Sequence, residues 1–159
     1  SGVLQAAASD EIHVYESDGG KEKTLFKGTI STVQTKHANG VYEIEIEGLS
    51  GTYLMDMKRH RRTYQNTAMS YAALVQKVAG SYSGHQVLSI VGDGVNLGSP
   101  VIQYDETDWA FLKRLASHFN TVVACDIWDA KPRLYFGMPK GKRFTLPEET
   151  PYMAGKDLL

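Results

Sequence analysis

The strongest constraint on the fold is a pair of strand-like segments joined by Asn39-Gly40. Residues 23–36 (KTLFKGTISTVQTK) are rich in Thr, Val and Ile, and residues 41–49 (VYEIEIEGL) alternate between apolar and acidic side chains. Asn and Gly both tolerate the positive φ of a tight hairpin turn. Because side chains alternate between the two faces of a strand, the second segment has an apolar face, Tyr42, Ile44 and Ile46, and an acidic face, Glu43, Glu45 and Glu47. The sequence therefore predicts an antiparallel hairpin with one buried face.

The rest of the chain predicts further strands and two helices. The expected strands are residues 11–15, 86–91 and 99–104 and a terminal hairpin formed by TVVACDIW and RLYFGM. Residues 67–78 predict a helix capped by Thr67, and residues 106–119 predict a second helix. Residues 54–65 are interpreted as a short extended segment that carries a basic run. Strands dominate and pair locally, which favours an α+β fold, mainly antiparallel β, with a barrel-like sheet and two helices.

Length and charge narrow the class of protein. The 159 residues fit one domain that can bury a real core. The net charge of −1 lacks the basic excess that is typical of nucleic-acid binders, and no stretch resembles a membrane span, so neither nucleic acid nor membrane is expected as a partner. We expect residues 1–10 to be a tag remnant and lead-in, residues 11–137 to be the domain, and residues 138–159 to be an extension or the start of a truncated further segment.

Three acids, Asp105, Glu106 and Asp108, stand at the start of the second predicted helix. The helix face that follows them is apolar: Phe111, Leu112, Leu115, Ala116 and Phe119, with Trp109 at its edge. Clustered acids can form a catalytic pair or a metal site. They are also typical of a helix start, where a side-chain oxygen caps the first turn and negative charge suits the helix dipole. Asp105 and Thr107 are both candidates for the N-cap, and capping is favoured because no second group is seen to converge on these acids.

The other candidate sites give weaker signals. The basic run KRHRR, residues 58–62, could contact phosphates, but alternate side chains of an extended segment point to opposite faces, so a solvated or inter-subunit surface is favoured. The loop GDGVNLG, residues 92–98, leads into a strand, whereas a phosphate-binding loop leads into a helix. The histidines lack metal-ligand spacing, and Cys125 is interpreted as a small core residue. We therefore expect no catalytic, cofactor-binding or metal-binding residue, no cofactor and no enzymatic activity.

Three segments, LFKGTIS at 25–31, RTYQN at 62–66 and QYDETDWAFLKRLASHF at 103–119, carry a resemblance to a known family. They resemble, in family order, segments of the baseplate hub proteins of contractile injection systems. That family includes the late control protein D of contractile phages, the baseplate hub of myophages and the N-terminal hub part of VgrG spikes. The third segment is the most specific, and the residues that match the family signature are Gln103, Tyr104, Glu106, Thr107, Asp108, Trp109, Phe111, Leu112, Arg114 and Leu115.

The resemblance implies a structural role. Family members form trimers whose tube-like β-barrel domains make a pseudo-sixfold ring, and this ring joins the tail tube to the spike. For this chain, the resemblance implies a homotrimer in the full-length assembly, with tail tube, baseplate and spike proteins as partners. It also implies a place in a phage tail, or in a phage-like particle, that is assembled in the bacterial cytoplasm. The chain is expected to be a fragment or a minimal member of the family.

Two other classes of function remain open. A cell-wall hydrolase carried by a phage tail would need convergent acids. A ligand- or carbohydrate-binding module would need exposed aromatic side chains in a groove, for which Tyr53, Tyr64 and Tyr82 are candidates. For a hub, the basic run and the acidic strand face predict a subunit interface, because complementary charge sets the register of such contacts. The candidate interface residues are Arg59, Arg61, Arg62, Glu43, Glu45 and Glu47.

Overall fold

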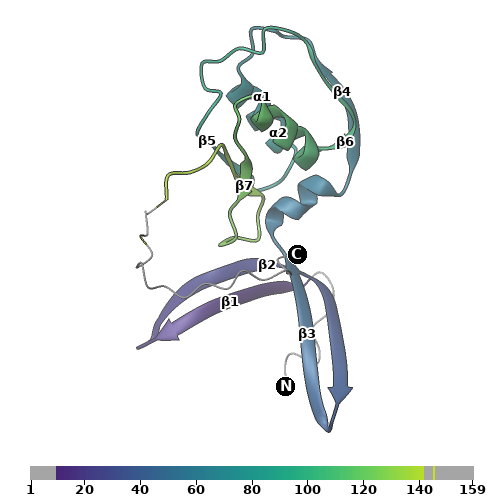
Figure 1. The fold of residues 1–159 in the computed structure, drawn as a ribbon, viewed down its shortest axis with the longest axis vertical. Helices are drawn as coiled ribbons and strands as arrows, with labels where there is room; N and C mark the ends of the chain where they lie inside the picture. The colour runs from purple at the N-terminus through teal and green to yellow at the C-terminus, as the bar shows by residue number, and fades with distance from the viewer. Residues whose placement is uncertain (1–9, 142–144, 146–159) are drawn as a thin grey trace.

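The computed structural model describes residues 10–141 and 145, which form a long twisted sheet and a body that lies above it (Figure 1). The long sheet has the strand order β1-β2-β3, and the elements are β1 (Glu11–Asp18), β2 (Lys21–Ala38) and β3 (Val41–Leu49). The elements of the body are the 3₁₀ helix η2 (Gly51–Asp56), β4 (Arg59–Tyr64), α1 (Tyr71–Ala79), β5 (Gln86–Ser89), β6 (Val101–Thr107), α2 (Asp108–Ser117), β7 (Val123–Cys125) and β8 (Arg133–Phe136). In the body, β4 pairs with β6, and β8 lies between β5 and β7.

The hairpin predicted from Asn39-Gly40 is confirmed as the β2–β3 pair. Asn39 and Gly40 have φ values of 53° and 79°, and the two strands pair in antiparallel register from Ala38 with Val41 to Thr29 with Leu49. Asn and Gly are the residues that adopt such positive φ values at low cost, so the turn chemistry sets the register of the whole hairpin.

β2 changes its pairing partner near its middle. Its residues Lys21–Thr29 pair with β1, and its residues from Thr29 to Ala38 pair with β3. A register shift between Ile30 and Thr32 marks a bulge at the exchange, and bulges bend a strand and increase its twist. The two hairpins therefore diverge in space, as Figure 1 shows. Over most of its length, β2 has a strand partner on only one edge among the described residues.

Close packing accounts for the two glycines beside this exchange. A Cβ atom on Gly28 would lie 2.3 Å from the Leu49 backbone oxygen and 2.6 Å from Cζ of Phe26, and one on Gly48 would lie 3.0 Å from Cγ2 of Ile12 and 3.1 Å from Cε1 of Phe26. The ring thus lies across two neighbouring strands at positions where neither has a side chain. Glycine in a strand interior often marks such a close approach. The Leu-Phe-x-Gly pattern of residues 25–28 therefore has a packing reason.

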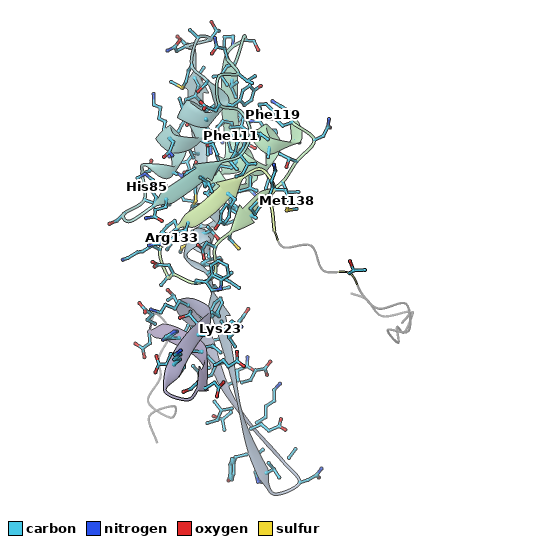
Figure 2. All side chains as sticks on the ribbon, turned by 90° about the vertical axis from the view of Figure 1, so that its left-hand side faces the viewer. Lys23, His85, Phe111, Phe119, Arg133 and Met138 are labelled. Atoms are coloured by element: carbon cyan, nitrogen blue, oxygen red, sulfur yellow. The ribbon has the colours of Figure 1, made fainter. Side chains whose placement is uncertain are left out.

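The hydrophobic core lies inside the body, between the two helices and the short strands. Its fully buried members include Met55, Leu74, Val75, Val78, Phe111, Leu112, Leu115 and Phe136. The helix faces predicted from the sequence are confirmed, because Leu74, Val75 and Val78 of α1 are buried, as are Phe111, Leu112 and Leu115 of α2. Figure 2 shows Phe111 and Phe119 within the body and Lys23 in the long sheet below it.

The predicted start of the first helix was wrong. The helix begins at Tyr71, with Ser70 as N-cap, because the Ser70 hydroxyl accepts a hydrogen bond from Ala73 N at 3.1 Å. Upstream, the Asn66 side chain accepts a hydrogen bond from Ala68 N at 3.1 Å and so forms a turn. The carbonyl of Thr67 accepts a hydrogen bond from Gly98 N at 3.1 Å, which ties this turn to the 92–98 loop and keeps Thr67 out of the helix.

Two burial predictions were also wrong. Cys125 is exposed, because it ends a three-residue strand at the edge of its sheet rather than lying in a core strand. The apolar face of the β2–β3 hairpin is uncovered: Tyr42 is 73% exposed and Ile44 is 40% exposed. The hairpin extends away from the body, so no described element reaches this face (Figure 1).

The predicted class, α+β with mainly antiparallel pairing, is confirmed, and the parallel β5–β8 pair is an addition to it. None of the three sheets closes into a barrel within residues 10–141, so the barrel-like shape stays a prediction. The lead-in predicted for residues 1–10, apart from Asp10, lies outside the described residues. So does most of the extension predicted for residues 138–159.

The fully buried position of Leu112 leads to a stability prediction. Leu112→Ala should lower the free energy of unfolding by about 2–5 kcal/mol, because it removes buried methyl groups and leaves a cavity between the helices. Lys113→Ala, at the exposed neighbouring position, is the matched control and should change the free energy by less than about 0.5 kcal/mol. Denaturant melts of both variants measure the difference, and equal midpoints would contradict the packing described here.

Candidate functional site: a buried carboxylate and an uncovered sheet face

The three acids at the start of α2 have three different environments. Thr107 is the N-cap of α2, because its hydroxyl accepts a hydrogen bond from Ala110 N at 3.1 Å. Asp105 has a φ of 52° and lies on the surface, and Glu106 forms an ion pair with Arg114. Asp108 alone is completely buried. The acids therefore do not converge on a common point, as a catalytic pair or a metal site would require.

Asp108 is the centre of a hydrogen-bond network. Its Oδ1 accepts a hydrogen bond from Arg62 Nη1 at 2.7 Å and another from Gln103 Nε2 at 2.8 Å. Its Oδ2 accepts a hydrogen bond from the Tyr82 hydroxyl at 2.8 Å and lies 3.5 Å from His60 Nε2. A buried carboxylate is tolerated when charged and neutral donors surround it in this way. The acid is thus structurally satisfied and has no oxygen left open to a substrate.

The hydrogen-bond roles of two neighbours of Asp108, His60 and Tyr82, are fixed by their partners. Arg62 Nη2 lies 3.0 Å from His60 Nδ1, and because the guanidinium can only donate, Nδ1 is the acceptor. In neutral His60 the proton therefore lies on Nε2, on the side of Asp108. Burial, together with the hydrogen bond to the Asp108 carboxylate, raises the pKa of the Tyr82 hydroxyl well above its usual range. Tyr82 is therefore a hydrogen-bond donor at every physiological pH.

The residues of the predicted signature divide into an inner and an outer set. The inner set holds the body together, and its buried members are Gln103, Asp108, Phe111, Leu112 and Leu115. Trp109 packs against the core, and Thr107 caps the helix. In the outer set, Arg114 binds Glu106 and donates to Ile102 O at 2.7 Å. Tyr104 is exposed and lies under the Arg61 guanidinium, 5.3 Å from its ring centroid.

The signature also contacts the segment RTYQN. Arg62 reaches Asp108, and Tyr64 stacks on Phe111 with 5.6 Å between the ring centroids. Asn66 forms the turn that precedes α1. Two of the three segments that matched the family pattern therefore meet in space and form one structural unit.

The candidate interface residues lie in two separate regions. Arg59 and Arg61 are exposed and lie 3.3 Å and 3.7 Å from the Asp105 carboxylate, whereas Arg62 is held by Asp108. On the hairpin, Glu45 forms an ion pair with Lys36. Glu43, Glu45 and Glu47 are all exposed. The structure brings neither region to the other within this chain, and it leaves Arg59 and Arg61 as the arginines that a partner can reach.

The long sheet has one apolar face. Because directly opposed residues of paired strands point to the same side, the register of the three strands assigns this face. The apolar residues of this face are Ile12, Val14, Phe26, Ile30, Val33, Tyr42, Ile44 and Ile46, and Thr35 and His37 lie on the same side, opposite Ile44 and Tyr42. The opposite side of the β2–β3 hairpin carries Gln34, Lys36 and the three glutamates. Ile30, at the base of this face, is buried beside η2, whereas Tyr42 and Ile44, toward the hairpin tip, are exposed and no described element covers them.

Sites for a cofactor or a carbohydrate have little support in the described part of the chain. No group of three or more His, Cys, Asp or Glu side chains there is arranged to hold a metal ion. Of the three tyrosines considered for a binding groove, Tyr64 is buried and Tyr82 points to Asp108, which leaves Tyr53 exposed. Among the described residues, no helix is long and apolar enough to cross a membrane.

The sequence analysis missed the partners of Asp108. One available signal was the alternation of β4, which places His60, Arg62 and Tyr64 on one face. Because Tyr64 is an aromatic residue suited to a core, this alternation could have placed Arg62 on the inner side with it, whereas Arg62 was predicted to be an interface residue. Tyr82 gave no comparable signal, because it lies in the loop between α1 and β5, and only the folded chain brings it to α2.

Asp108→Asn tests the network. We expect a loss of about 3–5 kcal/mol in the free energy of unfolding, because Arg62 then loses its buried counter-charge. Asp105→Asn is the matched control, since Asn tolerates the same positive φ and the exposed ion pairs there contribute at most about 1 kcal/mol. Urea melts at neutral pH compare the two, and an Asp108→Asn protein as stable as the control would refute the structural role of the carboxylate.

A comparison with known families agrees with the resemblance seen in the sequence. The chain matches the family model of the phage tail baseplate hub (GPD) over residues 3–134. No curated protein matches the chain. The matched range includes the long sheet, the Asp108 network and both helices. The chain therefore belongs to the phage tail baseplate hub family.

Proposed function

We propose that this chain is a structural hub component whose long sheet forms part of a ring between the tail tube and the spike. The observation that supports this proposal most strongly is the uncovered apolar face of the β2–β3 hairpin. Alternating strands with one apolar face are stable in water when that face is covered, and large exposed apolar surfaces mark interaction sites. A neighbouring subunit is the natural cover, because the described part of this chain supplies none.

The open edges of β2 support the same proposal. β1 occupies one edge of the strand up to Thr29, and β3 occupies the other edge beyond it. At Lys27 the backbone N also donates to Ile127 O of the body, so the open part of the edge lies away from this position. Unpaired strand edges offer backbone donors and acceptors that can pair with another strand. Strands from neighbouring subunits that used these edges would continue the sheet around a closed ring. The barrel-like shape expected from the sequence is in this view a property of the assembly.

The ring would belong to a homotrimer of the full-length protein, with tail tube, baseplate and spike proteins as its partners. We place it in the tail of a phage, or in a related contractile particle such as one with a VgrG-type spike, that is assembled in the bacterial cytoplasm. Covalent chemistry is not part of this role, since Asp108, the one buried acid among the described residues, is fully bound by protein donors. Nucleic acid and membranes are not binding partners in this proposal.

Opposite charges would set the contacts between subunits. The proposed residues are Arg59, Arg61, Arg62, Glu43, Glu45 and Glu47. Arg62 contributes by fixing β4 through Asp108, whereas Arg59 and Arg61 lie at the surface and can meet the glutamates of a neighbour. Such rim charges guide register and the rate of association more than affinity.

Ile44→Glu in the full-length protein tests the covered face. We expect incorporation into particles to fall at least tenfold, because the change would bury an unpaired charge at the interface. Gln34→Glu, on the polar side of the same hairpin, is the matched control and should leave incorporation unchanged. Immunoblots and electron microscopy of purified particles measure incorporation, and thermal melts verify that both chains fold. Normal particles with Ile44→Glu would contradict the proposal that this face is covered.

The charge contacts are tested separately by reversing Arg59 and Arg61 together to Glu. We expect a several-fold loss of incorporation that is larger at low ionic strength and smaller at high ionic strength, because salt screens a solvent-accessible charge contact. Lys113→Glu, an exposed change on α2, is the control. Arg62 is left in place so that the fold is preserved. A doubly reversed chain that assembles as well as the control would exclude these arginines from the interface.

A further inference from the structure

We propose that the tip of the β2–β3 hairpin of one copy inserts Tyr42 into an apolar socket beside η2 of a neighbouring copy. The inference rests on the proposed hub role and adds a specific pair of surfaces to it. One surface is the hairpin tip, and the other is a cavity at the base of the same hairpin.

The socket is a cavity of about 290 Å³ where the long sheet meets the body. Its apolar lining residues are Ile30, Leu49, Tyr53, Leu54, Met57 and Ala130. Leu54 and Met57 are three residues apart along and just beyond a 3₁₀ helix, so they lie on the same side of it. Met57 is 64% exposed and Leu54 is 49% exposed, although Ile30 beside them is buried. The cavity therefore has an apolar floor and an apolar rim open to solvent.

The tip carries a side chain that such a socket would accept. Tyr42 is 73% exposed, and Val41, which is 60% exposed on the opposite side of the strand, would meet the rim of the socket. The Tyr42 ring lies 4.3 Å from the His37 ring, which orients it before any partner arrives. A side chain that is already oriented loses less conformational entropy on binding. Aromatic residues that fill a pocket are also the residues that contribute most of the energy in protein interfaces.

The tip cannot fill the socket of its own chain. From Ile30, which lines the socket, to Ala38 beside the turn, the strand rises about 26 Å at roughly 3.3 Å per residue. The hairpin is a paired ribbon that extends away from the body (Figure 1). A contact between tip and socket is therefore intermolecular and joins two different surfaces. Contacts of this head-to-tail kind produce closed rings when the rotation between copies closes.

Charge favours the same partner. Lys58 and Arg59 directly follow Met57 of the socket, and Arg61 comes two residues later. Glu43 directly follows Tyr42 of the tip, and Glu45 comes two residues later. Near the socket, Asp105 forms ion pairs with both arginines and Asp56 adds a second negative charge, so the excess of positive charge there is small. On the hairpin, Lys36 binds Glu45, which leaves Glu43 and Glu47 as the net acidic charge. Insertion of Tyr42 would bring these groups of opposite sign together.

Cysteine cross-linking within assembled particles tests the contact. Cys125, which is exposed, is first replaced by Ser, and Val41→Cys and Met57→Cys are then introduced together. After mild oxidation, we expect disulfide-linked dimers and higher multimers on denaturing gels without reductant. The matched control combines Val41→Cys with Leu88→Cys, an exposed position on β5 outside the socket, and should give at least tenfold less linked protein.

The cross-linking experiment distinguishes failure of the tip–socket contact from failure of the hub role. If the chain is present in purified particles but the tip–socket pair links no more than the control pair, the hub role stands and the socket assignment is wrong. If the wild-type chain is absent from purified particles, the proposed hub role itself fails. Strong linkage of the tip–socket pair alone would support both.

Discussion

The buried carboxylate of Asp108 connects parts of the body that are far apart in the sequence. Arg62 comes from β4, Gln103 from β6 and Tyr82 from the loop after α1, and all three donate to the first residue of α2. Because a buried charge without these donors would be very unfavourable, the network permits one arrangement of the four segments. The stacking of Tyr64 on Phe111 and the burial of the α2 face follow from that arrangement.

Local patterns predicted the parts of this fold that local chemistry determines. The Asn39-Gly40 turn, the apolar face of α2 and the terminal hairpin all follow from neighbouring residues. The start of α1 did not, because a contact between Thr67 and the distant Gly98 decides it. Asp108 shows the limit most clearly. Its position suits a helix-capping acid, and only the meeting of distant strands makes it a buried counter-ion.

The body and the long sheet differ in how completely their own residues cover their apolar surface. The body has a closed core and a filled polar network, whereas the long sheet combines a regular apolar and polar alternation with an apolar face that is open. The alternation on the uncovered hairpin is the pattern that supports the proposed subunit contact. The signature that marks the family lies in the body and is not part of the apolar sheet face that is proposed as a contact surface.

The change of pairing partner along β2 has a mechanical consequence. One uninterrupted strand belongs to both hairpins, so tension applied along the β2–β3 hairpin is carried by covalent bonds through Thr29 into the β1–β2 pair. The cross-strand hydrogen bonds then lie perpendicular to the load and resist it together instead of opening one after another. A backbone hydrogen bond from Lys27 N to Ile127 O, 2.7 Å long, ties the same strand to the body. The long sheet can therefore carry tension along β2 without its cross-strand hydrogen bonds opening one after another.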